Sequence, residues 1–207
     1  MQRPKNFSIS ISTPYRGLLN RMRMDHDRER EIIASVLRGD RQIYALLVEA
    51  YQTPIFNLAY RMTGSLPEAE DLAQETFIRA YEKLWRWRPE KSFFVWLYTI
   101  GLNLIRNHLK KKQKSERRDA DWAEDPEGGD AEVKAADQPE GLLLEDERQK
   151  MLQACLLRLP ADLREAVVLR FYEDQPFENI ARICGISLSS AKMRVYRGIE
   201  KLQGMME

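Results

Sequence analysis

Residues 159–202 read LPADLREAVVLRFYEDQPFENIARICGISLSSAKMRVYRGIEKL, and this stretch decides how the C-terminal part of the chain folds. A first amphipathic helix is indicated by an apolar face at Ile180, Ala181 and Ile183. Gly185 then supplies a backbone that tolerates positive φ, and the hydroxyl of Ser187 can cap the helix that follows. Two helices joined by such a tight turn predict a helix-turn-helix.

The helix expected after this turn separates apolar from basic side chains. Its apolar residues recur at helical spacing and define an inward face, formed by Ala191, Val195, Ile199 and Leu202. The other faces carry four basic residues that could reach phosphates and base edges in a major groove, namely Lys192, Arg194, Arg197 and Lys201. The pattern favours sequence-specific DNA binding. A basic helix that is merely solvated is the alternative, because many helix pairs joined by glycine never contact DNA.

Charge is distributed in blocks, although the chain as a whole is almost neutral. The sequence has 207 residues, of which 43% are hydrophobic and 31% charged, and a formal net charge of +1. Residues 105–118 contain seven Lys or Arg and one Glu, whereas residues 116–140 contain ten Asp or Glu and three Lys or Arg. This asymmetry predicts one basic working face and a separate acidic segment in a soluble helical protein.

We expect an all-α protein with two small helical domains joined by a flexible acidic linker. Helical periodicity extends over residues 28–114, which form the first domain, and returns over residues 141–207, which form the second. Residues 115–140 are acidic, rich in Gly and Pro and nearly free of large apolar side chains, so they cannot bury enough surface to fold alone. Residues 1–27 predict a disordered N-terminal extension, to which we assign no function.

Four helices are expected within residues 28–114. Glycine or proline ends or interrupts the helical pattern at Gly39, Gly64 and Pro89. The second helix is expected to be disturbed near Pro54. Ser65, followed three residues later by Glu68, resembles a capping box and predicts the start of the third helix.

Residues 85–98 combine six aromatic residues with basic neighbours. Part of this set is expected in a small helical core, as an inward stripe of Phe93, Trp96, Leu97 and Ile100. The rest is expected in a loop that holds Trp85, Arg86, Trp87, Arg88 and Lys91. The next helix carries amides and cations at Asn103, Arg106, Asn107 and Lys110. Rings beside cations and amides can stack on unpaired bases and neutralise phosphates, which favours contact with single-stranded DNA.

The segment DLAQETFIRAY, residues 71–81, is amphipathic in a different way. Its apolar side is expected to consist of Leu72, Phe77 and Ile78. Its polar stripe consists of Asp71, Gln74, Glu75 and Arg79. Taken alone, this stripe is most simply an ordinary solvated helix face.

No constellation of residues indicates an enzyme. The histidines are His26 and His108, and no glycine-rich phosphate loop, metal-ligand cluster or nucleophile–base pair is recognisable, so we expect no catalytic site, no metal and no cofactor. Cys155 and Cys184 lie in apolar helical patterns, which predicts small buried hydrophobes in a reducing cytosol. No apolar run approaches the ~20 residues of a membrane span, and no signal peptide is evident. A cytoplasmic protein without membrane insertion is therefore expected.

In their order along the chain, these segments resemble the extracytoplasmic-function (group IV) RNA polymerase sigma factors of the sigma-70 family, over about residues 28–203. The resemblance rests on DLAQETF, on the aromatic-basic WLYTIGLNLIRNHLKK, on the acidic linker and on the helix-turn-helix. It implies that residues 28–114 are sigma region 2 and that residues 141–207 are sigma region 4. It also implies no separate third sigma domain, because residues 115–140 are too few and too polar to form one.

The resemblance implies three contact surfaces. Docking on the clamp helices of polymerase β′ would involve Asp71, Gln74 and Glu75. Melting of the −10 element and capture of a flipped base would involve Trp85, Arg86, Trp87, Arg88, Lys91, Asn103, Arg106, Asn107 and Lys110. Reading of the −35 element in the major groove would involve Ser189, Ser190, Lys192, Met193, Arg194, Tyr196 and Arg197. The acidic linker would thread through the RNA exit path of the polymerase.

The implied partners are core RNA polymerase, through its β and β′ subunits, promoter DNA in duplex and single-stranded form, and a cognate anti-sigma factor. The polymerase would supply all catalysis. Asn179, Ser189-Ser190-Ala191 and Met193 depart from the usual family residues, which bears on the −35 sequence that is read. The alternative is a stand-alone helix-turn-helix regulator that binds duplex DNA as a dimer without polymerase. The tryptophans of the loop argue against it, because duplex binders do not need exposed tryptophans.

Overall fold

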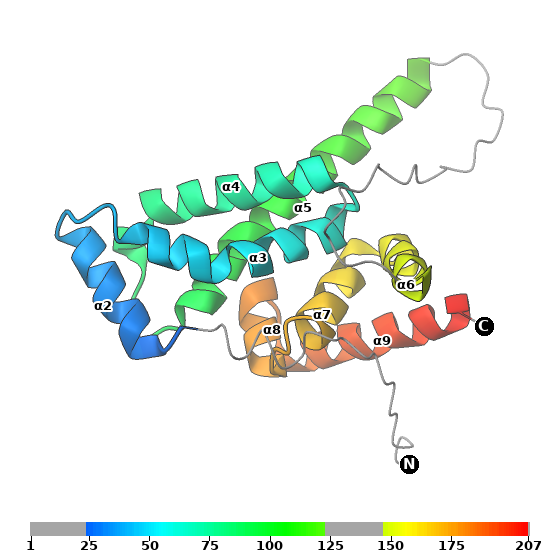
Figure 1. Ribbon diagram of the computed structural model, residues 1–207. Helices are drawn as coiled ribbons and strands as arrows, with labels where there is room; N and C mark the ends of the chain where they lie inside the picture. The colour runs from blue at the N-terminus through cyan, green and yellow to red at the C-terminus, as the bar shows by residue number, and fades with distance from the viewer. Residues whose placement is uncertain (1–23, 123–146, 207) are drawn as a thin grey trace, which may run out of the picture.

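The computed structural model describes residues 24–122 and 147–206 (Figure 1). Within these two ranges the chain forms α-helices and one short 3-10 turn, and no strand occurs in them, which confirms the all-α class expected from the sequence. Residues 1–23 of the predicted N-terminal extension and most of the predicted linker lie outside the described residues. No helix in the described ranges is long and apolar enough to span a membrane.

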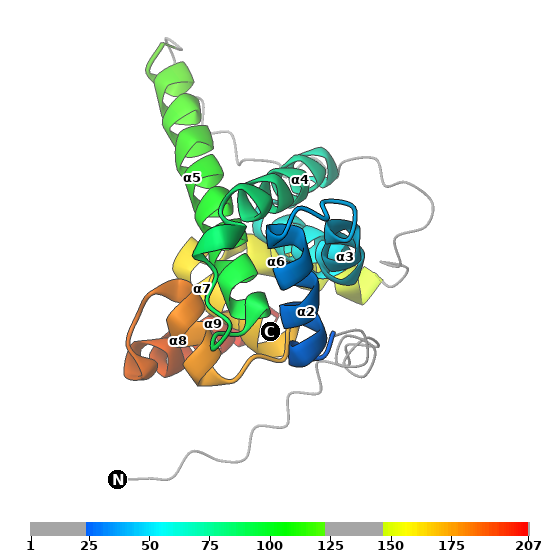
Figure 2. The ribbon, with the colours of Figure 1, turned by 90° about the vertical axis from the view of Figure 1, so that its left-hand side faces the viewer.

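The first bundle contains four α-helices and the 3-10 turn η1. Its elements are α2 (His26–Leu37), α3 (Tyr44–Thr63), α4 (Leu66–Glu82), η1 (Leu84–Arg86) and α5 (Phe93–Trp122). Helices α3, α4 and α5 pack as mutual neighbours, with α2 beside α3 (Figure 2). Their inward faces form a core of fully buried side chains that includes Leu47, Leu58, Met62, Leu97 and Leu102. This burial of apolar faces stabilises the bundle.

Glycines follow α2 and α3 at the predicted positions. Gly39 has φ +113° and Gly64 has φ +74°, conformations that other residues adopt only with strain. The disturbance expected at Pro54 is absent, since α3 is continuous through it. Tyr51 and Ile55 on either side of the proline are buried, and their packing holds the helix although the proline lacks an N–H.

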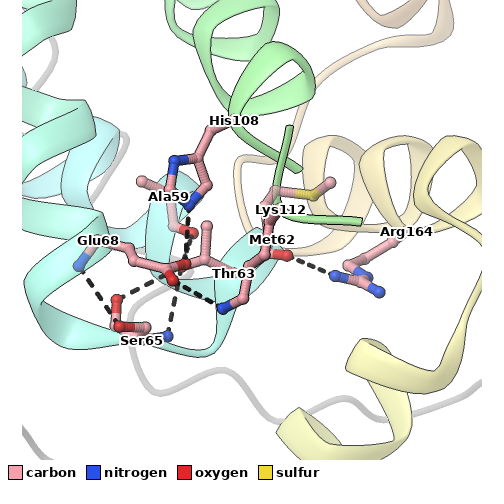
Figure 3. A network of polar contacts seen from close by, with 8 residues as sticks. All are labelled: Ala59, Met62, Thr63, Ser65, Glu68, His108, Lys112 and Arg164. Atoms are coloured by element: carbon pink, nitrogen blue, oxygen red, sulfur yellow. Dashed lines mark hydrogen bonds and ion pairs between the residues drawn. The ribbon is translucent and has the colours of Figure 1, made fainter. Parts of the chain in front are cut away.

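Half of the predicted capping box forms at the start of α4 (Figure 3). Ser65 Oγ accepts the N–H of Glu68 at 3.4 Å, but the Glu68 carboxylate does not return to the Ser65 N–H, which instead donates to the Thr63 hydroxyl. The two Glu68 carboxyl oxygens lie 2.7 Å from Lys112 Nζ and 3.1 Å from His108 Nε2. The carboxylate is therefore used to join α4 to α5 and not to complete the cap.

Helix α5 extends past the position where the linker is expected to begin. It continues to Trp122, whereas the composition predicts a boundary after residue 114. Neither glycine nor proline occurs between Gly101 and Pro126, and the side chains of residues 110–118 are exposed, so nothing stops the helix at that point. Figure 2 shows the C-terminal part of α5 projecting beyond both bundles.

The second bundle contains α6 (Glu147–Arg158), α7 (Ala161–Phe171), α8 (Phe177–Cys184) and α9 (Leu188–Met206). The predicted helix-turn-helix is confirmed in α8 and α9. Gly185 has φ +69°, and Ser187 Oγ accepts the N–H of Ser190 at 3.2 Å as an N-cap. Gly198 lets α9 approach α7 closely, because a Cβ there would lie 2.5 Å from a methyl group of Val167.

The two bundles pack against each other, an arrangement that we call closed. Helices α3 and α5 of the first bundle contact α6, α7 and α8 of the second (Figure 1). Arg164 of α7 lies at this junction and donates to the carbonyl of Met62, near the end of α3, and to the carbonyls of Leu157 and Leu159 at the end of α6. A cation at the C-terminal ends of two helices satisfies carbonyls that have no intrahelical partner.

Candidate nucleic-acid interface

Helix α9 presents most of its predicted DNA-reading residues to solvent. Ala191, Val195 and Leu202 are buried against the neighbouring helices and Ile199 is half-buried, so the predicted inward face is confirmed. The outward faces expose Ser189, Ser190, Lys192, Met193, Tyr196 and Arg197. Met193 is 51% exposed and Tyr196 62%, so apolar as well as charged atoms are available for contact.

Arg194 is oriented differently from the rest of this set. Its side chain is only 28% exposed, and its Nε lies 3.6 Å from the carboxylate of Asp162 on α7. The ring of Phe177, at the start of α8, lies 5.9 Å from Lys192 Nζ and 6.3 Å from the Tyr196 ring. Phe177 therefore supports two exposed residues of α9. Sequence reasoning missed it, because the cations near its ring, Arg170 and Lys192, come from other helices and are brought there only by the fold.

The two tryptophans of the η1–α5 segment have different surroundings. Trp85 is 66% exposed, and the guanidinium of Arg86 lies 4.7 Å from its ring centre. Trp87, expected to be exposed, is only 7% exposed, because its ring packs edge-on against Phe93 at 6.3 Å. Of the two rings, Trp85 is thus the one available for stacking on a base. Around them, Arg86, Arg88 and Lys91 are exposed, as a contact with phosphates requires.

A polar network ties the loop between η1 and α5 to α2. His26 Nε2 lies 3.1 Å from the carbonyl oxygen of Pro89, and its Nδ1 lies 3.4 Å from a carboxyl oxygen of Glu29. Burial raises the pKa of Glu29, although hydrogen bonds from Tyr51, His26 and the Phe93 N–H lower it. Sequence reasoning missed this network, for which a histidine three residues before a glutamate was the only indication. This network fixes the loop at two points, the Pro89 carbonyl in its middle and the Phe93 N–H at the start of α5.

The predicted −10 residues on α5 fall into two groups. Asn103, Asn107 and Lys110 are exposed. Arg106 is half-buried and bonds the buried carboxylate of Glu165 on α7 as a fork, with Nε to Oε1 at 2.8 Å and Nη2 to Oε2 at 2.5 Å. The hydrogen bonds to Glu165 raise the pKa of the Arg106 guanidinium, although burial lowers it. In the closed arrangement, Arg106 is therefore engaged by the second bundle.

The outward face of α4 carries the residues predicted to dock on the polymerase. Asp71 and Gln74 are exposed, and Glu75 accepts a hydrogen bond from Arg79 Nε at 2.6 Å. Leu72 and Phe77 are buried as predicted, but Ile78, expected on the inward side, is 54% exposed. Position 78 lies too far around the helix from 72 and 77 to reach the core. Tyr81 is also exposed, so this face offers apolar contact beside its charges.

The two cysteines are buried and free, as predicted. Burial raises the pKa of Cys184 to about 12, which keeps its thiol protonated and unreactive at neutral pH. Within residues 24–122 and 147–206, no three His, Cys, Asp or Glu side chains gather in a group that could hold a metal ion.

Comparison with protein families and curated relatives identifies the two bundles. Residues 47–115 match the Sigma-70 region 2 model and residues 149–202 match the Sigma-70, region 4 model. The chain is 33% identical over 181 residues to the RNA polymerase sigma-H factor of Pseudomonas aeruginosa, an alignment that covers 86% of this chain and 94% of the relative. It is 34% identical over 178 residues to the ECF RNA polymerase sigma factor SigW of Bacillus subtilis, covering 83% and 92%.

Solved structures share the fold. CnrH, in complex with the cytosolic domain of CnrY, superposes with a TM-score of 0.64 at 21% identity and covers 88% of this chain and 97% of its own. The sigma factor RpoE of Bartonella quintana, in complex with the anti-sigma factor NepR, gives a TM-score of 0.59 at 25% identity, covering 79% and 96%. The matches favour a sigma factor over a stand-alone regulator. This chain belongs to the extracytoplasmic-function RNA polymerase sigma factors of the sigma-70 family.

Proposed function

We propose that this sigma factor reads the −35 element with α9, captures the opened −10 strand with Trp85 and α5, and docks on core RNA polymerase with the outward face of α4. The observation that carries the proposal is the exposure of Met193, Tyr196 and Arg197 on the second helix of a helix-turn-helix in a sigma-70 relative. A helix displayed in this way can enter a major groove without rearrangement of its own bundle.

At the −35 element, rigidity and reach come from opposite faces of α9. Ala191 and Val195 are buried and fix the helix on its bundle, while Lys192 and Arg197 are exposed and can contact phosphates and base edges. An arginine that bonds a guanine in bidentate fashion contributes roughly 1–3 kcal/mol of discrimination against other bases. The exposed Tyr196 ring and Met193 side chain offer apolar contact to thymine methyl groups.

At the −10 element, Trp85 offers a ring on which an unpaired base can stack, a contact worth roughly 1–3 kcal/mol. Arg88 and Lys91 lie exposed in the following loop, and Asn107 and Lys110 lie exposed on α5. These residues supply the cations and amides that a single strand requires after the duplex opens.

Core RNA polymerase is the proposed partner at α4, through its β′ and β subunits, and it supplies the catalysis. The protein itself acts as an initiation factor in the cytoplasm and not as an enzyme. Because the similar sigma factor RpoE of Bartonella quintana was solved with a bound anti-sigma factor, we also propose a cognate anti-sigma factor for this chain. Such an inhibitor would act by covering the polymerase- and DNA-contacting faces.

Reconstitution with core RNA polymerase tests the proposal. The purified chain is mixed with core enzyme, and both co-purification and run-off transcription on genomic promoter fragments are measured. We expect a stable complex and transcripts that begin at discrete sites, each preceded by shared −35 and −10 sequences. A chain that ignores core polymerase but binds duplex DNA tightly by itself at ~150 mM salt would instead support a stand-alone regulator.

A further inference from the structure

The junction between the two bundles is polar where it crosses α5. Two carboxylates of the second bundle reach residues of that helix: Glu165 bonds Arg106, and Glu173 Oε2 accepts the Tyr98 hydroxyl at 2.6 Å. Tyr98 and Arg106 are eight residues apart, so they lie about two turns apart on one side of α5. Both carboxylates are buried in the closed arrangement. The second bundle thus places two acids along the helix that was predicted to bind the −10 strand.

The bond to Glu165 uses the donors that a phosphate would use. A guanidinium fork has the same geometry for a carboxylate and for a phosphate, because both present two oxygens to adjacent N–H groups. Arg106 directs Nε and Nη2 to Glu165, and Nη2 also lies 3.5 Å from the carbonyl of Cys184. A DNA phosphate and Glu165 therefore cannot hold this edge of Arg106 at the same time.

Further contacts give the closed arrangement a defined geometry. The guanidinium of Arg61 lies 4.0 Å from the ring centre of Tyr172, and Gln153 Nε2 lies 3.4 Å from the carbonyl of Tyr60. Gly64 leaves room for Leu157, whose methyl group would lie 2.5 Å from a Cβ at that position. The residues on α3 that make these contacts and the Arg164 contact lie in its last turn.

Opening this junction leaves no charge stranded. Glu165 and Arg106 belong to different bundles, so separation returns both to water together, and a buried ion pair has little net advantage over its solvated partners. The junction also buries apolar side chains, because Leu169, Ile180 and Ile183 of the second bundle belong to the same buried cluster as the core of the first, so separation must expose apolar surface as well as the ion pair.

The −35 surface is not used in the closed arrangement. Helix α9 packs on α6, α7 and α8 of its own bundle, and Tyr196 and Arg197 remain exposed. Closure therefore affects the two DNA contacts unequally, because it occupies Arg106 but leaves α9 displayed.

We propose that Glu165 is an internal competitor for the −10 strand: in the free chain it holds Arg106, and the strand binds this guanidinium only when the bundles separate. The proposal rests on the assignment of α5 to the −10 strand. The apparent affinity is proportional to the fraction of molecules that are open. A chain that is open about one tenth of the time therefore binds a single strand about tenfold more weakly than a chain that is always open.

The test uses the full chain with Glu165→Lys, which places a cation opposite Arg106. Glu178→Lys, the same charge change at an exposed position of α8, is the matched control. Small-angle scattering measures the radius of gyration, and fluorescence anisotropy measures binding to a mixed-sequence single-stranded 20-mer and to the corresponding duplex. We expect Glu165→Lys to expand the chain and tighten single-strand binding roughly tenfold relative to the control, with equal duplex binding.

Two further variants guard against misfolding. The double variant Arg106→Glu with Glu165→Lys restores an ion pair with reversed signs, so the chain should become compact again while single-strand binding stays weak. Glu173→Gln weakens the Tyr98 bond without adding a charge and should show a smaller change in the same direction. A radius of gyration that matches the control for both Glu165→Lys and Glu173→Gln would show that these carboxylates do not hold the chain closed, and would overturn the proposal.

The outcomes separate this inference from the proposed function. Expansion without a gain in single-strand binding over Glu178→Lys would show that the carboxylates do not compete with DNA. If no variant binds either DNA and none supports run-off transcription, the proposed function fails, whereas the scattering result still decides whether the ion pair closes the chain.

Discussion

Helices α9 and α5 are both amphipathic and basic, yet they stand in opposite relations to the rest of the molecule. On α9, the predicted contact residues other than Arg194 face outward, and the apolar stripe faces its own bundle. On α5 and the preceding segment, Arg106 is bonded to Glu165 and Trp87 is buried, while Trp85 and Lys110 remain exposed. The comparison shows that a basic residue at the correct helical spacing is available only if no other part of the chain has engaged it.

The largest effect is expected at Trp87, on the inward side of this comparison. Trp87→Ala should lower the free energy of unfolding by about 3–5 kcal/mol, because it removes a ring packed against Phe93 and leaves a cavity. Urea unfolding followed by circular dichroism measures this change. A stability equal to that of the unchanged protein would show that Trp87 is not part of the core.

Trp85 lies on the outward side and should behave in the opposite way. Trp85→Ala should leave the unfolding free energy within about 0.5 kcal/mol of the unchanged protein, as expected for an exposed site. Loss of a stacked base should weaken strand capture by roughly 1–3 kcal/mol. Permanganate footprinting of the holoenzyme on promoter DNA measures this as reduced reactivity at −10 thymines. An unchanged footprint would exclude Trp85 as a stacking ring.

Arg197 tests the displayed surface of α9. Arg197→Ala should weaken binding at the −35 element by roughly 1–3 kcal/mol and reduce discrimination at one base position, with core polymerase binding unchanged. Competition between holoenzymes on promoters with single −35 substitutions measures it. Arg158→Ala, which removes an exposed arginine from α6, is the control for a general loss of positive charge. Equal promoter choice in both variants would contradict the recognition role of Arg197.

The outward face of α4 is a third surface, and it is displayed like α9. Replacing Gln74 and Glu75 together by Ala should weaken core polymerase binding by roughly 1 kcal/mol or more, with −35 duplex binding by the free chain unchanged. Ile78→Ser tests the apolar part of the same face. Both are measured by titration of labelled core enzyme, with Glu49→Ala on α3 as the control. Unchanged affinity for core polymerase in both variants would show that the docking surface does not include this face of α4.

The smallest effect is expected at Glu68, which joins α4 to α5 away from either DNA contact. Burial raises the pKa of this carboxyl, but hydrogen bonds from Lys112 and His108 outweigh it, so the pKa is lowered from 4.5. A lowered pKa contributes stability that is present above 4.5 and is lost as the pH falls through the folded-state value. Glu68→Gln should therefore reduce Tm at pH 7 by an amount equivalent to less than about 1 kcal/mol. The difference from the unchanged protein should vanish in strong acid; a difference that persists there would mean that charge is not its cause.

Sequence reasoning succeeded where the determinants are local. Gly185 and Ser187 define the turn of the helix-turn-helix within a few residues, and the period of Ala191 and Val195 defines the inward face of α9. It failed where a residue depends on a distant partner. The bond between Arg106 and Glu165 joins positions 59 residues apart, which no periodicity within one helix encodes.

The errors on α4 and in the loop have different origins. Ile78 lies on the opposite side of the helix from the buried residues, so helical spacing alone could have placed it outward. Trp87 is buried because the chain after η1 turns back onto Phe93, a path set by the His26 and Glu29 network with the Pro89 carbonyl. The extra length of α5 shows that acidic composition alone does not mark the end of a helix.

Arg164 and its neighbour Glu165 hold the same junction, but their contacts tolerate sequence change differently. Arg164 bonds the backbone carbonyls of Met62, Leu157 and Leu159, and these carbonyls are present whatever side chains occupy the three positions. Glu165 bonds the side chain of Arg106, so a change in either partner must be matched by the other. A chimera that exchanges the second bundle between relatives can therefore keep the first contact without adjustment, whereas the second must be transplanted as a pair.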